Sequence, residues 1–147
     1  RFNVPMGRYK DPLLRVLDRI QPASEILKGV GIRHGAFDDL TPKPSKGALV
    51  YFDPPYVPLT KTSAFTAYTK QGFGEKEQLA LRDLALRLHE RGCYVMLSNS
   101  CTDETLAWYK DAPFKIYEIP VRRAISASGA SRKIVQEIIV TTYDFKH

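Results

Sequence analysis

The sequence has few cysteines and histidines, and it contains no long apolar run. No stretch approaches the roughly 18 apolar residues that a membrane-spanning helix needs, and the opening residues lack a signal-peptide pattern. The two cysteines, Cys93 and Cys101, make no disulfide framework and have no metal-ligand spacing. His34, His89 and His147 share no spacing typical of a metal site. These absences argue against a membrane protein, and they indicate a cytoplasmic protein with reduced thiols and no metal.

Positively charged residues are only modestly in excess over negatively charged ones. The chain carries 22 Lys and Arg against 16 Asp and Glu, a formal net charge of +6. Such an excess is compatible with a polyanionic partner, but it is common in proteins without one. The basic residues gather toward the two ends of the chain: Arg1, Arg8, Lys10, Arg15, Arg19, Arg122, Arg123, Arg132 and Lys133. A solvated surface is the more frequent explanation of such clusters, and convergence on one phosphate backbone is the alternative.

The length of 147 residues suits a single domain. The first residue is Arg1 rather than Met, and the opening segment FNVPMG has the composition of a structured element. We therefore expect the chain to be a piece of a longer protein, without its N-terminal part. Residues 1–12, which carry Pro, Gly and aromatic side chains, are predicted to form a loop or hairpin arm.

Apolar periodicity predicts alternating helices and strands along the rest of the chain. The most regular pattern covers residues 75–91, where leucines recur between charges and Gly92 marks the end. Residues 57–74 show little periodicity, so we expect a surface loop, and such long loops are usually functional or disordered. Helices are predicted over residues 22–30, 75–91 and 103–109, and strands over residues 31–37, 48–52, 94–97, 114–119 and 134–143.

This alternation is typical of an α/β domain with a mostly parallel sheet and a final antiparallel strand pair. Ligands of such sheets bind at the carboxyl ends of the strands. Asp38, Asp53 and Asn99 each follow a predicted strand, so we expect them on one common edge. Asn99 could orient a loop there or cap the helix that begins at residue 103. The second interpretation is favoured, because Asn is a common N-cap residue.

The segment Asp53-Pro54-Pro55-Tyr56, called the DPPY motif below, suits a flat ring with an amino group. Two prolines stiffen the backbone and remove two N–H donors, so carboxylate and carbonyl oxygens remain as acceptors. An exocyclic NH₂ group could donate to both while the ring stacks on Tyr56. These bonds would stabilise the charge that develops on the amino nitrogen as it attacks an electrophilic methyl group. A simple turn after a strand is the structural alternative for the four residues alone.

The DPPY motif after an apolar strand resembles the catalytic motif of amino-methyltransferases, and its Asp form is typical of adenine-N6 enzymes. The whole chain is similar to the Dam family, the D12 class of DNA adenine methylases. Four stretches in family order carry the resemblance: FNVPMGRYK, DPPYVPLTKTSAFTAYTKQGF, VMLSNS and VRRAISASGASRKIVQEIIV. The resemblance implies the Rossmann-like fold of class I S-adenosylmethionine-dependent methyltransferases. It also implies methyl transfer to N6 of an adenine flipped out of duplex DNA, without a metal.

The resemblance implies roles for individual positions. Asp53 and the Pro54 carbonyl would hold the adenine amino group, Pro55 would complete the rigid segment, and Tyr56 would stack on the base. Residues 1–12 would be the end of the target-recognition region, in a form that the family shows in enzymes reading GATC. DNA contacts are implied in that segment, in the loop after the motif and in a basic loop near the end: Pro5, Arg8, Tyr9, Lys10, Phe65, Tyr68, Arg122, Arg123, Ser126, Ser128, Arg132 and Lys133.

The chain departs from the family in its cofactor-binding segment. The Gly-rich motif that cradles S-adenosylmethionine is missing, because Gly29-Val30-Gly31 ends a predicted helix and follows no strand. Phe37 and Asp38 correspond to part of the cofactor's adenine pocket, and Asp53 borders it. We therefore expect residues 13–147 to be the C-terminal portion of the catalytic domain, with poor cofactor binding and weak or no activity by itself.

Two other functions stay open at this point. One is amino-methylation of a different nucleic-acid target, such as cytosine N4 or an RNA adenine, against which Asp53 and the opening segment argue. The other is a non-catalytic DNA-binding module, which the missing Gly-rich motif favours. The sequence is compatible both with a solitary methylase and with half of a restriction–modification system.

Overall fold

The computed structural model describes residues 14–40, 43–59, 73–122 and 134–144. The chain divides into two compact units, Arg1–Gly35 and Ala36–His147. The predicted arm over residues 1–12 lies outside the described residues, as does most of the predicted loop over residues 57–74. The described ends of that loop, residues 57–59 and 73–74, are neither helix nor strand.

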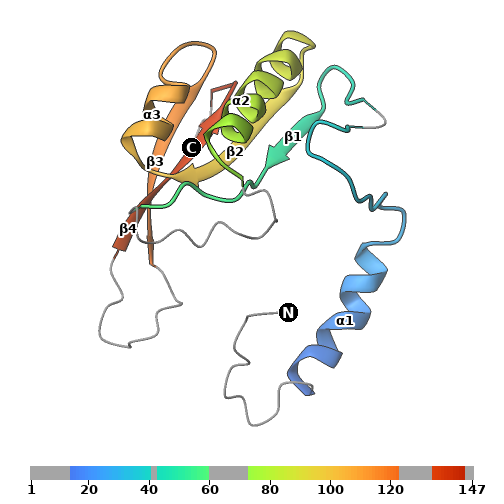
Figure 1. Ribbon diagram of the computed structural model, residues 1–147. Coiled ribbons are helices and arrows are strands. Elements are labelled where there is room, and N and C mark those ends of the chain that lie inside the picture. The colour runs from blue at the N-terminus through green and yellow to red at the C-terminus, as the bar shows by residue number, and fades with distance from the viewer. Residues whose placement is uncertain (1–13, 41–42, 60–72, 123–133, 145–147) are drawn as a thin grey trace. The chain divides into compact units, whose positions relative to one another are not determined.

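The first unit contains the helix α1 (Leu14–Ile26), drawn in blue in Figure 1. The prediction of a helix over residues 22–30 was wrong about both ends, because the helix begins at Leu14 and ends at Ile26. The preceding residues include two Leu, two Arg and one Gln, which favour helix, and Pro22 removes one backbone donor without ending the helix. Gly29 follows the helix with a φ of 85°, a left-handed conformation that stops helices.

The strand predicted over residues 31–37 is not formed. This segment has no helix or strand in the structure, and among the described residues no strand pairs with it. A strand exists only when a neighbour accepts and donates its ladder hydrogen bonds. Local apolar character was therefore not sufficient to make one here.

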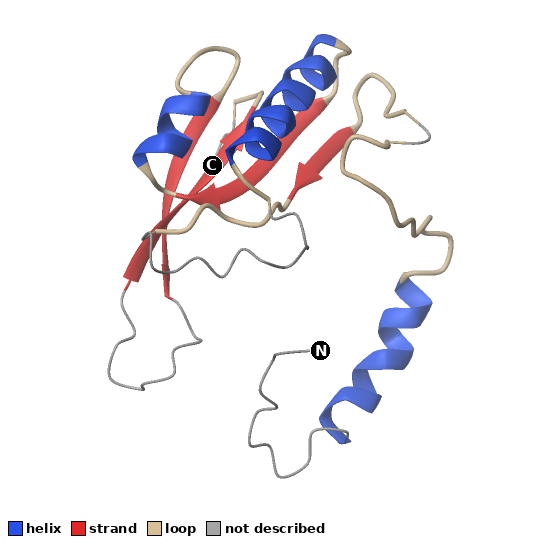
Figure 2. Ribbon diagram, viewed as in Figure 1, coloured by secondary structure: helices blue, strands red, loops and turns tan. Residues whose placement is uncertain are grey.

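The second unit is built on a sheet whose described strands have the order β1-β2-β4-β3 (Figure 2). β1 and β2 are parallel, whereas β4 is antiparallel to both β2 and β3. Of the described strands, β1, β2 and β3 run in one direction and β4 runs in the opposite one, so the sheet is mixed and the predicted final antiparallel pair is confirmed. The parallel neighbours β1 and β2 are joined through a helix, the connection that such a pair needs. The strands are β1 (Leu49–Phe52), β2 (Tyr94–Ser100), β3 (Lys115–Arg122) and β4 (Ile134–Thr141).

Two helices pack on one face of this sheet, as Figures 1 and 2 show. They are α2 (Glu75–Glu90) and α3 (Asp103–Tyr109), and both predictions are confirmed. Along α2 the buried side chains recur at helical spacing, which is why this helix has one face for the core. The core beneath the two helices consists of Phe52, Leu81, Leu84, Ala85, Leu88, Cys93, Val95, Leu97, Tyr109, Ile138 and Val140.

The opposite face of the sheet carries exposed apolar side chains and is called the uncovered face below. Successive side chains of a strand point to opposite faces, so the register assigns each residue to one side. Paired Leu49 and Tyr94 are 62% and 52% exposed, while the next pair, Val50 and Val95, points toward α2. The exposed large apolar side chains of the uncovered face are Leu49, Tyr51, Tyr94 and Ile119.

Candidate active site

The DPPY motif begins directly after β1. This strand ends at the buried Phe52, and the next residue, Asp53, is exposed to solvent. The three following residues of the motif are half-buried and belong to no helix or strand. Proline cannot donate to a sheet ladder, which explains why the strand ends at this point. The predicted place of the motif, at the carboxyl end of an apolar strand, is confirmed.

The hydroxyl of Ser98 holds the Asp53 carboxylate. Ser98 Oγ donates to Asp53 Oδ1 over 3.0 Å, and it lies 3.0 Å from the hydroxyl of Tyr51. Because the one proton of Ser98 goes to Asp53, the Tyr51 hydroxyl donates to Ser98. The parallel register brings Asp53 and Ser98 together, because they directly follow the paired residues Phe52 and Leu97. A carboxylate has about four lone-pair sites, so Asp53 keeps acceptor capacity for a ligand.

Tyr56 contributes a half-buried aromatic ring to the same end of the sheet. Burial raises the pKa of its phenol, and a hydrogen bond with Ser98 partly opposes that effect. The phenol therefore stays uncharged throughout the neutral range. An uncharged, partly exposed ring is suited to stacking against a flat heteroaromatic ligand.

Two buried amide side chains hold the backbone on either side of Tyr56. Asn99 Oδ1 accepts from the Val57 amide over 2.9 Å, and Asn99 Nδ2 donates to Gln78 Oε1 over 3.1 Å. Gln78 Nε2 in turn donates to the Pro55 carbonyl over 2.9 Å. The DPPY motif is thus connected to β2 and α2 by direct hydrogen bonds.

The interpretation of Asn99 as a helix cap was wrong. Asn99 lies inside β2, which continues to Ser100, and the N-cap of α3 is Thr102. The alternative, that Asn99 orients a loop at the strand's end, agrees with its bond to Val57. Sequence reasoning did not single out Gln78 or Ser98 as site residues. A signal for Gln78 was present, because this polar residue precedes Leu81 by three positions on the apolar face of α2.

A family model named D12 class N6 adenine-specific DNA methyltransferase matches residues 1–125 of the chain. The chain belongs to this family. The match includes the DPPY motif together with Gln78, Ser98 and Asn99, so the hydrogen-bonded site described above lies within the matched part.

Relatives with assigned names are similar to nearly the whole chain. A type II methyltransferase of Lactococcus lactis subsp. cremoris is 43% identical over 145 residues, which are 97% of this chain and 50% of the relative. A type II methyltransferase of Methanocaldococcus jannaschii is 37% identical over 143 residues, 97% of this chain and 49% of the relative. A DNA adenine methylase of Escherichia coli K12 is 36% identical over 138 residues, 94% of this chain and 49% of the relative. The chain spans about half the length of these relatives.

Asp38, Asp53 and Asn99 were predicted to lie on one edge of the sheet, and two of the three do so. Asp53 and Asn99 lie at the carboxyl ends of the parallel strands β1 and β2, as expected. Asp38 does not, because no strand precedes it within the described residues 14–37. Asp38 lines a cavity of about 260 Å³ beside the C-terminal half of α2. The residues that line this cavity are Asp38, Leu40, Lys43, Pro44, Leu84, Arg87, Leu88 and Arg91. Its neighbour Phe37 contacts Phe73 edge to face, with ring centroids 5.8 Å apart.

Most of the residues expected to contact DNA in this family lie outside the described residues. The exception is Arg122, whose backbone ends β3 and pairs with Ile134 of β4. The others are Pro5, Arg8, Tyr9, Lys10, Phe65, Tyr68, Arg123, Ser126, Ser128, Arg132 and Lys133. Their roles stay predictions.

The described part of the chain contains no cluster of three or more His, Cys, Asp or Glu residues with the geometry of a metal site. Within the same residues, no helix is long and apolar enough to cross a membrane. Cys93 and Cys101 are both free thiols.

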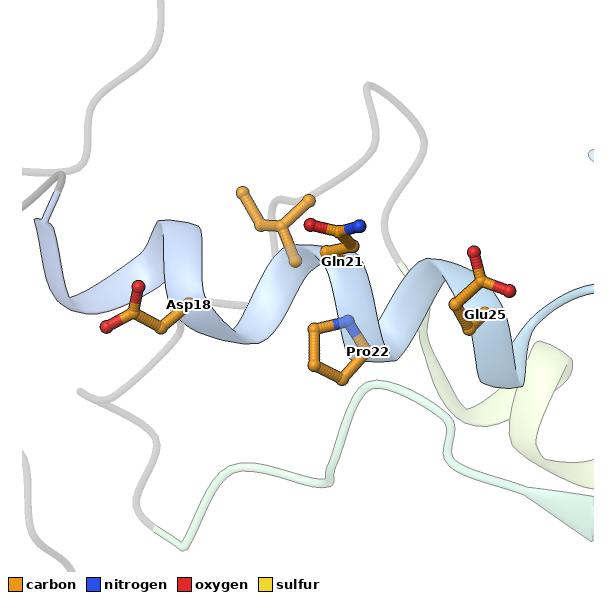
Figure 3. Close-up of a pocket in the computed structure, with 5 residues that line it drawn as sticks. Asp18, Gln21, Pro22 and Glu25 are labelled. Atoms are coloured by element: carbon orange, nitrogen blue, oxygen red, sulfur yellow. The ribbon is translucent and has the colours of Figure 1, made fainter.

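A hollow of about 790 Å³ lies along α1. Its lining residues all come from this one helix, and Figure 3 shows four of them, Asp18, Gln21, Pro22 and Glu25, on successive turns. A surface formed by one exposed helix offers no converging groups from a second element. This hollow therefore does not provide a candidate active site.

Proposed function

We propose that the protein containing this chain is an adenine-specific DNA methyltransferase, which transfers a methyl group to N6 of adenine in duplex DNA. The observation that carries this proposal is the Asp53 carboxylate, held by Ser98 at the end of a strand and followed by the half-buried Tyr56. The names of the relatives, DNA adenine methylase and type II methyltransferase, support the same reaction class.

The residues of the DPPY motif would bind the amino group of the target base. In the proposed arrangement Asp53 and the Pro54 carbonyl each accept one of the two N6 hydrogens. Acceptance of both hydrogens concentrates electron density on the nitrogen and stabilises the positive charge that develops there during attack. The Tyr56 ring would stack on the base, which has to leave the duplex to reach the site.

S-adenosylmethionine, the methyl donor used by the family, supplies an electrophilic methyl group when it is bound. Phe37, Asp38 and Asp53 would contribute to its site from this chain. The half-buried ring of Phe37, packed edge to face on Phe73, fits contact with a flat purine. The sequence contains no Gly-rich cofactor motif, so the cofactor site would be completed by residues outside these 147.

Duplex DNA is the proposed partner, with GATC as the proposed target sequence. Residues 1–12 would form the end of the target-recognition region, and residues 13–147 the C-terminal portion of the catalytic domain. The basic loop around residues 122–133 would contact phosphates, because Arg, Lys and free backbone N–H groups are the usual phosphate ligands. The net charge of +6 supports a polyanionic partner.

The Rossmann-like class I methyltransferase fold is the proposed architecture of the whole protein. Two features of the described residues support it. β1 is an edge strand with the sequence LVYF, whereas edge strands exposed to solvent usually carry charges or proline. The uncovered face also bears exposed apolar side chains, whereas sheets with parallel strands are normally covered on both faces. A further strand beside β1 and helices on the uncovered face would bury both.

The activity can be tested by transfer of a labelled methyl group from S-adenosylmethionine to duplex DNA. The full-length gene product is incubated with unmethylated duplexes that contain either GATC or the same bases scrambled. We expect transfer to the GATC duplex, and a loss of about 100-fold or more in kcat for Asp53→Ala, the order found when one charge-stabilising group is removed. Asp111→Ala removes an exposed carboxylate far along the chain and serves as the matched control, with kcat within about twofold.

Each outcome of this test decides one part of the proposal. Transfer to both duplexes retains the chemistry and rejects the GATC assignment. Transfer to RNA or to cytosine alone rejects adenine in DNA as the target. The absence of transfer to any nucleic acid, combined with tight DNA binding, supports a non-catalytic DNA-binding protein and rejects the enzyme.

A further inference from the structure

We propose that Gln78 and Asn99 are positioning residues, which hold Pro55 and Val57 so that the Pro54 carbonyl and the Tyr56 ring remain in place for the adenine. This inference rests on the proposed function, and it adds two residues that do not touch the base. Both side chains are buried, with exposed fractions of 2% for Gln78 and 0% for Asn99.

The DPPY motif cannot fix its own backbone. Pro54 and Pro55 lack N–H groups, so neither can donate to a neighbouring strand or turn. The atoms that the two amides hold, the Pro55 carbonyl oxygen and the Val57 nitrogen, lie on either side of Tyr56. External hydrogen bonds therefore supply the restraint that a sheet ladder would otherwise give.

The donor and acceptor of each hydrogen bond in the series Val57–Asn99–Gln78–Pro55 are fixed by the backbone groups at its two ends. The amides of Val57 and Ser100 can only donate, so the Asn99 atom that faces them at 2.9 Å must be its oxygen. Asn99 Nδ2 then donates to Gln78 Oε1, which leaves Gln78 Nε2 to face the Pro55 carbonyl, a group that only accepts. Each amide therefore needs both an oxygen and an NH₂ group, and neither can be reversed alone.

The arrangement distinguishes the two proline carbonyls. Gln78 uses the carbonyl of Pro55, so the carbonyl of Pro54 is the one assigned to the amino group of the base. On the other side of β2, the adjacent Ser98 holds Asp53. Neighbouring residues of one strand point to opposite faces, which allows β2 to hold both ends of the motif.

The decisive variants are Gln78→Glu and Asn99→Asp in the full-length protein. Both substitutions preserve the size and shape of the side chain, but each replaces an NH₂ donor with an oxygen. One of the hydrogen bonds between Val57, Asn99, Gln78 and Pro55 is then replaced by two oxygens that face one another. We expect kcat to fall by about 10- to 100-fold, because small displacements of reacting groups have effects of this size. The KM for DNA should change by less than about threefold, since phosphate contacts determine most of the affinity.

The pH profile separates a positioning role from simple packing. The carboxyl group of Gln78→Glu, once protonated, can again donate to the Pro55 carbonyl, and buried carboxyl groups take up a proton at higher pH than exposed ones. The activity of this variant relative to the wild type should therefore rise as the pH falls. Gln136→Glu, on an exposed position of β4, is the control and should follow the wild-type profile.

A second measurement requires no variant. The amide proton of Val57 should exchange with solvent at least about 100-fold more slowly than in an unstructured peptide, because it is bonded to a buried side chain. Exchange at the unstructured rate would overturn the proposal, as would wild-type kcat in both isosteric variants. If the wild type itself transfers no methyl group, the proposed function fails, and slow exchange at Val57 would show that the restraint exists without that function.

Discussion

At the scale of single residues, two tyrosine hydroxyls of the second unit lie in contrasting environments. The Tyr51 hydroxyl is bonded to Ser98 in the candidate site. The Tyr109 hydroxyl, on the last residue of α3, is fully buried and has no hydrogen-bond partner among the described residues. The ring of Tyr109 packs edge to face on Phe114, with centroids 5.0 Å apart. Its ring therefore contributes to the core, whereas its hydroxyl group does not.

Substitution of Tyr109 by Phe should make stability less sensitive to high pH. Burial raises the pKa of Tyr109 from 10.0 to about 12. Because the folded pKa is the higher one, the phenol's contribution to stability is complete below about pH 10 and is lost as the pH rises toward 12. Relative to Tyr109→Phe, the wild type should lose about 1.4 kcal/mol of unfolding free energy between pH 8 and pH 11.

Urea unfolding at the two pH values measures this difference. At pH 8 we expect Tyr109→Phe to be at least as stable as the wild type, because the lost hydroxyl group made no hydrogen bond. Phe114→Leu removes the ring partner without removing a titrating group, so its effect should be equal at both pH values. A constant difference between wild type and Tyr109→Phe would contradict the assignment.

At the scale of elements, the turn between α2 and β2 depends on a single glycine. The Gly92 amide donates to the His89 carbonyl over 2.7 Å, and the Cys93 amide donates to the Leu88 carbonyl over 3.0 Å. This pair of bonds is the Schellman arrangement that ends helices. Gly92 has a φ of 78°, which side-chain-bearing residues rarely adopt, and a Cβ there would lie 2.9 Å from Lys46 Cγ.

Replacement of Gly92 should destabilise the second unit in an order set by backbone strain. We expect Gly92→Ala to lower the free energy of unfolding by about 1–2 kcal/mol, since the left-handed region is unfavourable for alanine and Lys46 would have to move. Gly92→Asn should cost less than Gly92→Ala, because asparagine tolerates this region better although it is larger. Denaturant unfolding of both variants tests the order, and a lower stability of Gly92→Asn would indicate that space rather than φ is limiting.

The strand β3 shows how element boundaries depend on the place in the sheet. Sequence patterns predicted its end at Ile119, just before Pro120, but the strand continues to Arg122. Proline is tolerated on an edge strand, where one row of backbone groups faces away from the sheet. β3 is such an edge in the order β1-β2-β4-β3. Its true end was therefore not readable from local sequence.

At the scale of the whole molecule, the uncovered face of the sheet is the feature that most needs an explanation. Leu49, Tyr51, Tyr94 and Ile119 are between 41% and 62% exposed on it. The chain spans about half the length of its relatives, and the proposed Rossmann-like fold places further elements on this face. In the full-length protein these side chains should be buried.

Leu49→Lys tests that expectation in the full-length protein. If the proposed elements cover the face, introduction of a charge at Leu49 should cost about 2 kcal/mol or more of unfolding free energy. Ala80→Lys, on the exposed side of α2, is the control and should stay within about 0.5 kcal/mol. An equally small effect for Leu49→Lys would show that the face remains open to solvent.

The sequence by itself determined the elements and the chemistry that depend on local spacing. Leucines at helical intervals predicted α2, and the helix predicted over residues 103–109 is α3. An apolar run before two prolines predicted the end of β1. The DPPY motif and its family were also evident from short stretches of residues. These features were predictable because helix periodicity and proline geometry act within a few residues.

Only the tertiary structure decided which distant groups meet. The insertion of β4 between β2 and β3, the absence of a strand at residues 31–37, and the bonds from Ser98, Asn99 and Gln78 to the DPPY motif all depend on it. The bonded pairs are separated by 45, 42 and 23 positions in the chain. Strand order and register determine such contacts, and both result from the packing of the whole sheet and its helices rather than from any local pattern.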